Sequence, residues 1–232
     1  MLDFIRIACA VPAVRVGDTA KNAEDICAYI EKADGERADI VLFPELALTG
    51  YTCQDLFFQD TLWTGVQQGI RKIADCTKDH PGVTAAVGLP VRTGMRMYNC
   101  AAVISRGKIH ALVPKTYIPN YNEFYEKRWF SSGAEVTEDM AELLGEPVPI
   151  LPRAVFRVGG TLLGVEICED MWTPLPPSTF LALNGAEVIL NLSASNETIG
   201  KRAYRRGLVQ HQSAALNCVY AYCSAGSTES TQ

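Results

Sequence analysis

The stretch from Thr161 to Asp170 reads TLLGVEICED: an apolar run ends in a cysteine, and two acidic residues follow at once. The run is too short for a helix and begins just after Gly159-Gly160, which predicts a buried strand ending at Cys168. Ligands of open α/β sheets gather beyond the carboxyl ends of strands, so a substrate can reach a thiol placed there. On this stretch alone, the better interpretation is a small apolar residue capping a core strand, since free cysteines are often buried.

Two other predicted strands end with a charged side chain held just beyond them. An apolar strand over residues 39–43 is followed by a proline and Glu45, and a strand over 108–113 is followed by a proline and Lys115. Proline ends strand pairing and fixes the direction of the chain, so the next side chain is aimed and rigid. An acid, a base and a thiol are therefore presented in the same way by three strands.

Together these three side chains suit nucleophilic acyl transfer, in which the attacking species is a thiolate. Glu45 within reach of Cys168 would take the thiol proton, and burial would improve it as a base by raising its pKa. Lys115 would favour the thiolate and stabilise the oxyanion, an effect of roughly 3 kcal/mol for one such donor. A structural ion pair between Glu45 and Lys115 explains the spacing equally well, because ion-pair networks also collect charges.

Composition excludes several classes of function. The chain has 232 residues, 48% of them apolar, which is enough for one large domain or two small ones. Its net charge of −5 and lack of a basic block argue against a nucleic-acid surface. No apolar stretch is long enough to cross a bilayer, and the first residues lack the layout of a signal peptide, so we expect a cytoplasmic protein without a membrane partner.

Eight cysteines are scattered through the chain without a C-x-x-C pair. In a reducing compartment they are most simply free thiols. The three histidines form no metal-ligand spacing with each other or with the cysteines, so we expect no metal site. His211 falls on a predicted apolar stripe of the last helix and is interpreted as a core histidine.

Strands and helices alternate along the rest of the chain, with hairpins between them. Helices are predicted over 19–32, 61–78, 178–183 and 200–218, and strands over 2–11, 39–43, 83–91, 97–105, 108–113, 154–158, 161–168, 186–192 and 219–223. Residues 46–59 are interpreted as a loop over a sheet edge, and 116–149 as an irregular loop or lid. This order predicts an α/β layered fold with a mixed sheet or paired sheets. Nothing before Gln232 closes the last sheet edge, so we expect a fragment of a longer protein.

Three of these motifs resemble those of the nitrilase (carbon–nitrogen hydrolase) superfamily. They are FPE at 43–45, the Lys115 segment and GVEICED at 164–170, in the superfamily's glutamate, lysine and cysteine order. Within it, FPELALTGY at 43–51 followed by Asp55, PNYNEFYEKRWF at 119–130 and NLSAS at 191–195 resemble the glutaminase domains of glutamine-dependent NAD⁺ synthetases. The resemblance covers nearly the whole chain. It implies a glutamine amidohydrolase domain over residues 1–232, folded as an α-β-β-α sandwich that is truncated at its C-terminal end.

The resemblance also implies a mechanism, in which Glu45 is the general base, Lys115 the stabilising cation and Cys168 the nucleophile. Attack on the side-chain amide of L-glutamine would give a γ-glutamyl thioester and ammonia, and water would then release glutamate. No cofactor is implied for this domain. ATP and magnesium are expected only for a C-terminal synthetase domain, which would receive the ammonia and has no counterpart in this sequence. Homo-oligomers are common in the family, so a homo-oligomer is expected.

Six further residues are placed near the glutamine by their positions in the matching motifs: Tyr51, Tyr121, Glu126, Glu169, Ser195 and Lys201. The superfamily has a second glutamate near its lysine, and Glu123 competes with Glu126 for that position, with Glu126 favoured. Blander interpretations stay open. The two tyrosines can be packing residues with satisfied hydroxyls, Ser195 a turn residue, Lys201 a solvated first-turn residue and Glu169 part of the loop after the strand.

Three alternatives to a glutaminase remain. The first is an amidase or carbamoylase of the same superfamily acting on another amide. The second is a non-catalytic scaffold that keeps the motifs and serves as an oligomerisation or docking module. The third is a hydrolase that pairs Cys168 with His211, which no histidine motif supports.

Overall fold

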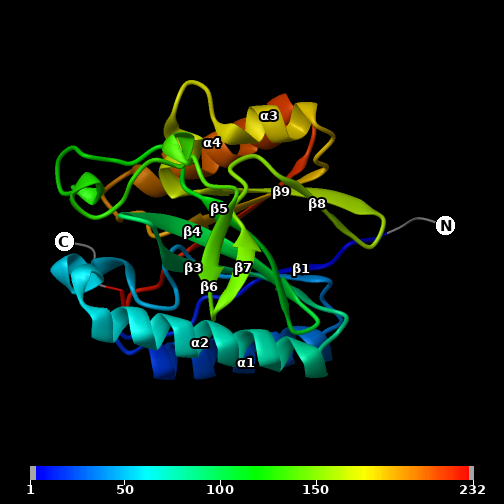
Figure 1. The fold of residues 1–232 in the computed structure, drawn as a ribbon. Coiled ribbons are helices and arrows are strands. Elements are labelled where there is room, and N and C mark those ends of the chain that lie inside the picture. The colour runs from blue at the N-terminus through cyan, green and yellow to red at the C-terminus, as the bar shows by residue number, and fades with distance from the viewer. Residues whose placement is uncertain (1–3, 230–232) are drawn as a thin grey trace.

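Four layers make up the molecule in the computed structural model, which describes residues 4–229. Helices α1 (Thr19–Gly35) and α2 (Asp60–Asp79) cover one sheet, a second sheet packs on the other face of the first, and α3 (Pro177–Leu183) and α4 (Lys201–Leu216) form the outermost layer. Figure 1 shows these layers stacked from the blue and cyan helices at the bottom to the yellow and orange helices at the top. The expected α-β-β-α sandwich is confirmed.

The first sheet has five strands in the order β1-β2-β3-β4-β5. Its first three strands are parallel, and the last three form an antiparallel meander that turns at Arg106-Gly107, as predicted. The strands are β1 (Ile7–Cys9), β2 (Ile40–Leu42), β3 (Thr84–Thr93), β4 (Arg96–Ser105) and β5 (Lys108–Pro114).

The second sheet has four strands in the order β11-β10-β9-β8. All but β8 are parallel, so the carboxyl ends of β9, β10 and β11 lie at one edge. The strands are β8 (Val155–Val158), β9 (Thr161–Ile167), β10 (Val188–Ser193) and β11 (Val219–Ser224). Apolar side chains of the two sheets meet between them, including Leu42, Val113 and Val165, and Cys168 lies at the border of this core.

The two long N-terminal helices pack through apolar stripes at helical spacing. Ile26 and Ile30 of α1 and Ile70 of α2 are fully buried in the core beneath the first sheet. Asp18, just before α1, caps the helix by accepting a hydrogen bond from the backbone N–H of Lys21 at 3.0 Å, which satisfies one free donor of the first turn.

The region from 116 to 149 is more regular than predicted. It contains two single 3₁₀ turns, Glu126–Arg128 and Gly133–Glu135, and a hairpin of β6 (Met140–Leu143) and β7 (Glu146–Pro149). The hairpin turns at Leu144 and Gly145, which both have positive φ, and it buries three alternate side chains against the core. The 46–59 segment likewise contains a 3₁₀ helix, Tyr51–Phe58. Sequence reasoning missed the hairpin because its strands are short and carry two prolines.

The last helix also departs from expectation. Every side chain of α4 is exposed or half-buried, and His211 is exposed, so its interpretation as a core histidine is wrong. Tyr204 of the same helix is 67% exposed. The period-3.6 pattern is present, but α4 belongs to the outermost layer and reaches little of the core.

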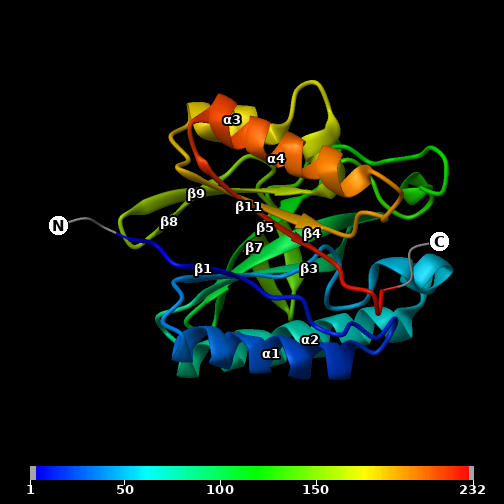
Figure 2. The same ribbon diagram turned by 180° about the vertical axis from the view of Figure 1, so that it is seen from behind.

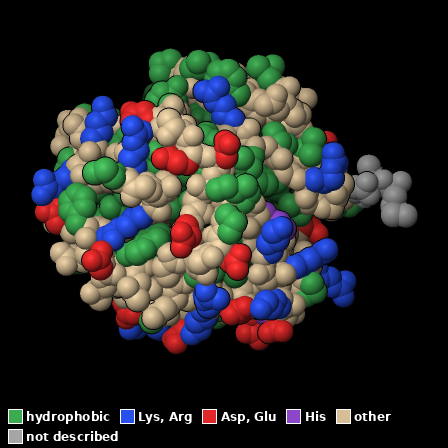
Figure 3. Space-filling view, in the orientation of Figure 1, with side chains coloured by type: hydrophobic (Ala, Val, Ile, Leu, Met, Phe, Trp, Pro, Cys, Tyr) green, Lys and Arg blue, Asp and Glu red, His purple; other side chains and the backbone are tan. Residues whose placement is uncertain are grey.

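The ends of the chain run along the edges of the sandwich. Only Ile7–Cys9 of the predicted strand 2–11 pairs, and residues 1–3 lie outside the described part. Figure 2 shows β11, in red, passing beside β1 and continuing toward the segment between β2 and α2. No helix within residues 4–229 combines the length and apolarity that a membrane crossing requires. On the face in Figure 3, basic and acidic side chains are interspersed.

Candidate active site

Cys168 lies at the carboxyl end of β9 and begins a 3₁₀ turn. Its φ of 43° is left-handed, a conformation that costs about 1–3 kcal/mol for a residue with a side chain and recurs at functional sites. Asp170 holds the turn, because its carboxylate accepts hydrogen bonds from the backbone N–H groups of Ile167 at 3.0 Å, Tyr117 at 2.8 Å and Thr116 at 3.1 Å. The cysteine turn is thereby clamped to the segment that follows β5.

Lys115 is held between two carboxylates, all three groups being almost fully buried. Its Nζ lies 2.6 Å from Oε1 of Glu45 and 2.8 and 3.0 Å from the two oxygens of Glu126. Burial alone would lower the pKa of Lys115, but the charges of Glu126 and Glu45 outweigh it and raise that pKa well above its usual range. The lysine therefore carries a permanent positive charge inside the protein.

Glu45 is oriented through both of its oxygens. Oε1 accepts from Nδ2 of Asn99 at 2.7 Å as well as from the lysine, and Oε2 accepts from the backbone N–H of Ala194 at 3.0 Å. The preceding residue, Ser193, donates its hydroxyl to Sγ of Cys168 at 3.1 Å. Consecutive residues at the end of β10 thus contact the carboxylate and the thiol, which places both groups in one site.

Electrostatics keep Cys168 as a thiol in the resting site. Burial raises the pKa of Cys168, the charge of Glu45 raises it further, and Lys115 and the hydroxyl of Ser193 oppose them. Burial also raises the pKa of Glu126 to about 7, against the lowering effect of Lys115. The site therefore holds a neutral nucleophile beside a carboxylate and a fixed cation.

A cavity of about 340 Å³ opens onto this site. Its walls include the thiol-bearing Cys168 and five of the six further residues that the sequence placed near the substrate: Tyr121, Glu126, Glu169, Ser195 and Lys201. The phenol of Tyr121 donates to the carboxylate of Glu169 at 2.9 Å, and the ammonium of Lys201 contacts Oδ1 of Asn196 and lies 5.2 Å from the ring centre of Trp172. The cavity wall thus carries a carboxylate, that of Glu169, and an ammonium group, that of Lys201.

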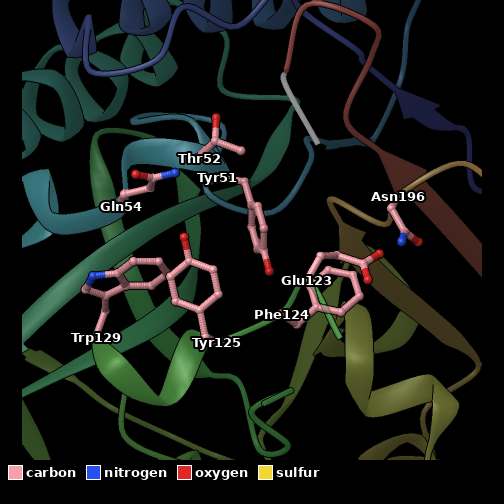
Figure 4. A pocket seen from close by; sticks show the side chains of 8 residues that line it. All are labelled: Tyr51, Thr52, Gln54, Glu123, Phe124, Tyr125, Trp129 and Asn196. Atoms are coloured by element: carbon pink, nitrogen blue, oxygen red, sulfur yellow. The ribbon is translucent and has the colours of Figure 1, made fainter. Parts of the chain in front are cut away.

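Tyr51, the sixth residue, lies in an adjoining pocket of about 30 Å³. Figure 4 shows its ring pointing from the 51–58 segment between Tyr125 on one side and Phe124 and Glu123 on the other. Its hydroxyl donates to Oε1 of Glu126 at 2.7 Å. Tyr51 therefore reaches the site through Glu126, whereas Glu123 lines both cavities and Glu126, not Glu123, contacts the lysine.

Within residues 4–229, no group of three or more His, Cys, Asp or Glu side chains is arranged to hold a metal ion. All eight cysteines carry free thiols. Cys168 differs from the other seven by standing on the wall of the cavity with the buried lysine and its two carboxylates.

The sequence from residue 6 to 230 matches the family model described as carbon-nitrogen hydrolase. The chain belongs to the carbon–nitrogen hydrolase family. The motifs around Glu45, Lys115 and Cys168, which suggested this family, are thus part of a match over nearly the whole chain.

Relatives of this hydrolase include the glutamine-dependent NAD(+) synthetases of Mycobacterium tuberculosis and Xylella fastidiosa. The first is 38% identical over 98% of this chain, and the second 37% identical over 96%. The chain spans about a third of the length of each, 34% and 37% respectively. Among solved structures, a glutamine-dependent NAD(+) synthetase from Cytophaga hutchinsonii matches 96% of this chain and 36% of its own, with 29% identity and a TM-score of 0.83.

A second structural neighbour is matched over most of its own length. An amidase from a Nesterenkonia species matches 95% of this chain and 76% of its own with a TM-score of 0.76, at 21% identity. At this identity, the likeness shows that the two chains share a fold.

Sequence reasoning missed two residues of the hydrolase site. Asn99 is 1% exposed in the middle of β4 and orients Glu45, and Ser193 is fully buried and contacts the thiol. The only sequence signal for Asn99 is a polar side chain inside a buried apolar strand, which needs a partner because an unpaired buried amide is costly. Ser193 lies within the NLSAS stretch, in which only Ser195 was predicted to lie near the substrate.

Proposed function

We propose that this hydrolase cleaves the side-chain amide of L-glutamine through a thioester on Cys168. The observation that carries the proposal is the buried lysine, held between Glu45 and Glu126, beside a thiol that opens onto a cavity. A thiol, a base and a fixed cation suit attack on a carbonyl with a poor leaving group. The names of the synthetase relatives described above support glutamine as the substrate.

In the first half of the reaction, Glu45 takes the proton of the Cys168 thiol and the sulfur attacks the amide carbon. The ammonium of Lys115 stabilises the negative charge on the oxygen of the tetrahedral intermediate, where one donor contributes about 3–4 kcal/mol. The carbon–nitrogen bond then breaks. The departing nitrogen takes the proton from Glu45, which yields ammonia and a γ-glutamyl thioester.

In the second half, water replaces ammonia beside Glu45. The carboxylate takes one proton from the water, and the hydroxide attacks the thioester carbon. The carbon–sulfur bond breaks, the sulfur recovers the proton held by Glu45, and glutamate leaves. Only side chains of this chain and water take part, so the proposed reaction uses no cofactor.

The cavity favours an amino-acid amide over a simple amide. Glu169 at its wall offers a carboxylate to the ammonium group of glutamine, and Lys201 offers an ammonium to the α-carboxylate. Tyr121, whose hydroxyl donates to Glu169, holds that carboxylate in place. Ser195, on the same wall, is proposed as a further polar contact with the substrate.

The wider context is also proposed. The long relatives support a synthetase domain as the acceptor of the ammonia, with ATP and magnesium belonging to that domain. Eight free thiols support a reducing, cytoplasmic compartment. An assembly of several copies is proposed from the family alone.

The test compares Cys168→Ala with Cys218→Ala, since both thiols are 8% exposed but only Cys168 lines the cavity. Ammonia and glutamate released from glutamine are measured, with other aliphatic amides as competitors. Cys168→Ala should abolish both products, and Cys218→Ala should retain them. Equal release by the parent chain and Cys168→Ala would reject the mechanism. Faster cleavage of another amide than of glutamine would reject the substrate.

A further inference from the structure

A series of two hydroxyl groups, from β10 and β11, leads to the nucleophile. Ser193, at the end of β10, lies 3.1 Å from Sγ of Cys168 through its Oγ, and the same oxygen lies 2.6 Å from the phenol oxygen of Tyr222 on β11. Ser193 is fully buried, and Tyr222 is half-buried beneath the guanidinium of Arg205. None of these contacts is used in the acyl-transfer steps above.

The number of hydroxyl protons fixes which group donates in each of these two hydrogen bonds. A serine hydroxyl has one hydrogen, and Ser193 donates it to the sulfur of Cys168. The phenol of Tyr222 must therefore donate to Ser193 rather than accept from it. Donors in series polarise one another, so the tyrosine strengthens the bond that the serine makes to the sulfur.

We propose that Ser193 is a further catalytic residue and Tyr222 its positioning residue, the two together stabilising the thiolate of Cys168 as Glu45 removes its proton. The transferred proton passes from sulfur to the Glu45 carboxylate, and the two hydroxyl protons stay on their own oxygens. The role in amide cleavage rests on the proposed function. The stabilisation of the thiolate does not, because it can be measured without any amide.

The surroundings of the thiol explain why such a donor is needed. Burial and the negative charge of Glu45 both oppose thiolate formation, and the charge of Lys115 is shared with two carboxylates. The hydrogen bond from Ser193 acts in the opposite direction and lowers the pKa of Cys168. The titratable groups whose charges reach the thiol are Glu45, Tyr51, Lys115, Tyr121, Lys201 and Tyr222.

The experiment measures the rate at which iodoacetamide alkylates Cys168 between pH 7 and pH 10, with the modified peptide followed by mass spectrometry. Ser193→Ala should slow alkylation about tenfold at a given pH, by raising the pKa of the thiol by roughly one unit. Tyr222→Phe should slow it less. Tyr220→Phe is the matched control: Tyr220 lies on the same strand, but its hydroxyl contacts Glu166 and Asn191 instead. This control should leave the pH profile of Cys168 unchanged.

The double variant tests the relay itself. Because Tyr222 acts through Ser193, adding Tyr222→Phe to Ser193→Ala should slow alkylation no further. Additive effects, or an unchanged pH profile in a folded Ser193→Ala protein, would overturn the proposal. If Ser193→Ala does not fold, an unchanged profile in Tyr222→Phe would overturn it. Alkylation and glutamine cleavage are measured separately. If the variants shift the alkylation profile although the parent protein cleaves no glutamine, the proposed substrate is rejected and this inference is supported.

Discussion

At the scale of single residues, the site depends on how buried charges are shared. Glu126 is kept near its lysine by three contacts: two from the ammonium of Lys115 and one from the phenol of Tyr51. Burial raises the pKa of Glu126 to about 7, and the hydroxyl of Tyr51 lowers it because that hydrogen bond favours the charged carboxylate. The protonation of Glu126 should therefore limit activity on the acid side.

Tyr51→Phe is expected to raise the pH below which activity is lost. Removing the donor disfavours the carboxylate of Glu126, so its pKa rises and the protein loses activity at a higher pH than the parent. The shift in the acid limb of kcat/KM should be about one pH unit, with little loss at pH 9. The measurement is ammonia release from glutamine between pH 5 and pH 9.

Tyr29→Phe serves as the control for this variant, because the Tyr29 hydroxyl contacts the backbone of Val11, outside the site. Superimposable acid limbs for the parent and Tyr51→Phe would show that Glu126 does not control the pH profile.

At the scale of elements, the loop after β2 is held by a glycine of β3. A Cβ on Gly88 would lie 2.3 Å from the backbone nitrogen of Leu46 and 2.6 Å from the carbonyl oxygen of Pro44. The carbonyl of Gly88 also accepts from the backbone N–H of Leu48 at 3.1 Å. Only a residue without a side chain allows this approach, so Gly88 sets the position of Glu45.

Gly88→Ala should displace the loop and separate Glu45 from Lys115. A shift of about 1 Å in a reacting group can lower the rate about a hundredfold, and the overpacking should cost about 1–3 kcal/mol of the free energy of unfolding. Activity per folded molecule and the midpoint of urea unfolding would be measured.

The matched variant is Gly207→Ala, in α4, where a Cβ meets nothing within 4 Å. It should keep activity and raise stability by about 0.5–1 kcal/mol, since alanine suits a helix better. A Gly88→Ala protein as active as this control would show that the contact does not position Glu45.

At the scale of the whole molecule, the C-terminal end of the described chain is anchored to the segment after β2. Glu229 is 5% exposed, and its Oε1 accepts from both the backbone N–H of Thr52 at 2.9 Å and its hydroxyl at 2.7 Å. These residues are 177 positions apart in sequence. Since Thr52 follows Tyr51, the segment after β11 secures the loop that supports Glu126.

Glu229→Ala should therefore weaken the fold and the site together. Loss of two hydrogen bonds to a buried carboxylate should lower the free energy of unfolding by roughly 1–3 kcal/mol. Amide hydrogen exchange should speed up in residues 51–58, because their anchor is gone. The exposed Glu142→Ala variant should change neither quantity. Unaltered exchange in residues 51–58 of Glu229→Ala would contradict the anchoring role.

Local signals in the sequence predicted most of the elements and placed three candidate site residues at strand ends, although they missed the β6–β7 hairpin. Apolar runs ended by proline or by a polar turn mark the strand ends before Glu45, Lys115 and Cys168, and all three do lie at strand ends. Helical periodicity located α1 and α2 to within a few residues. It misled for α4, where His211 is exposed, because an apolar stripe does not tell how much core lies within reach.

Residue types and spacing by themselves determined most of the elements, the layered fold and the placement of Glu45, Lys115 and Cys168 just beyond strands, since each is written in a short segment. Only the tertiary structure decided that Asn99 from the middle of β4 orients Glu45, and that Ser193 contacts the sulfur while Tyr222 of the neighbouring strand contacts Ser193. The reason is physical: these contacts depend on the stacking of two sheets and on which strands are neighbours. No period along the chain encodes that long-range packing.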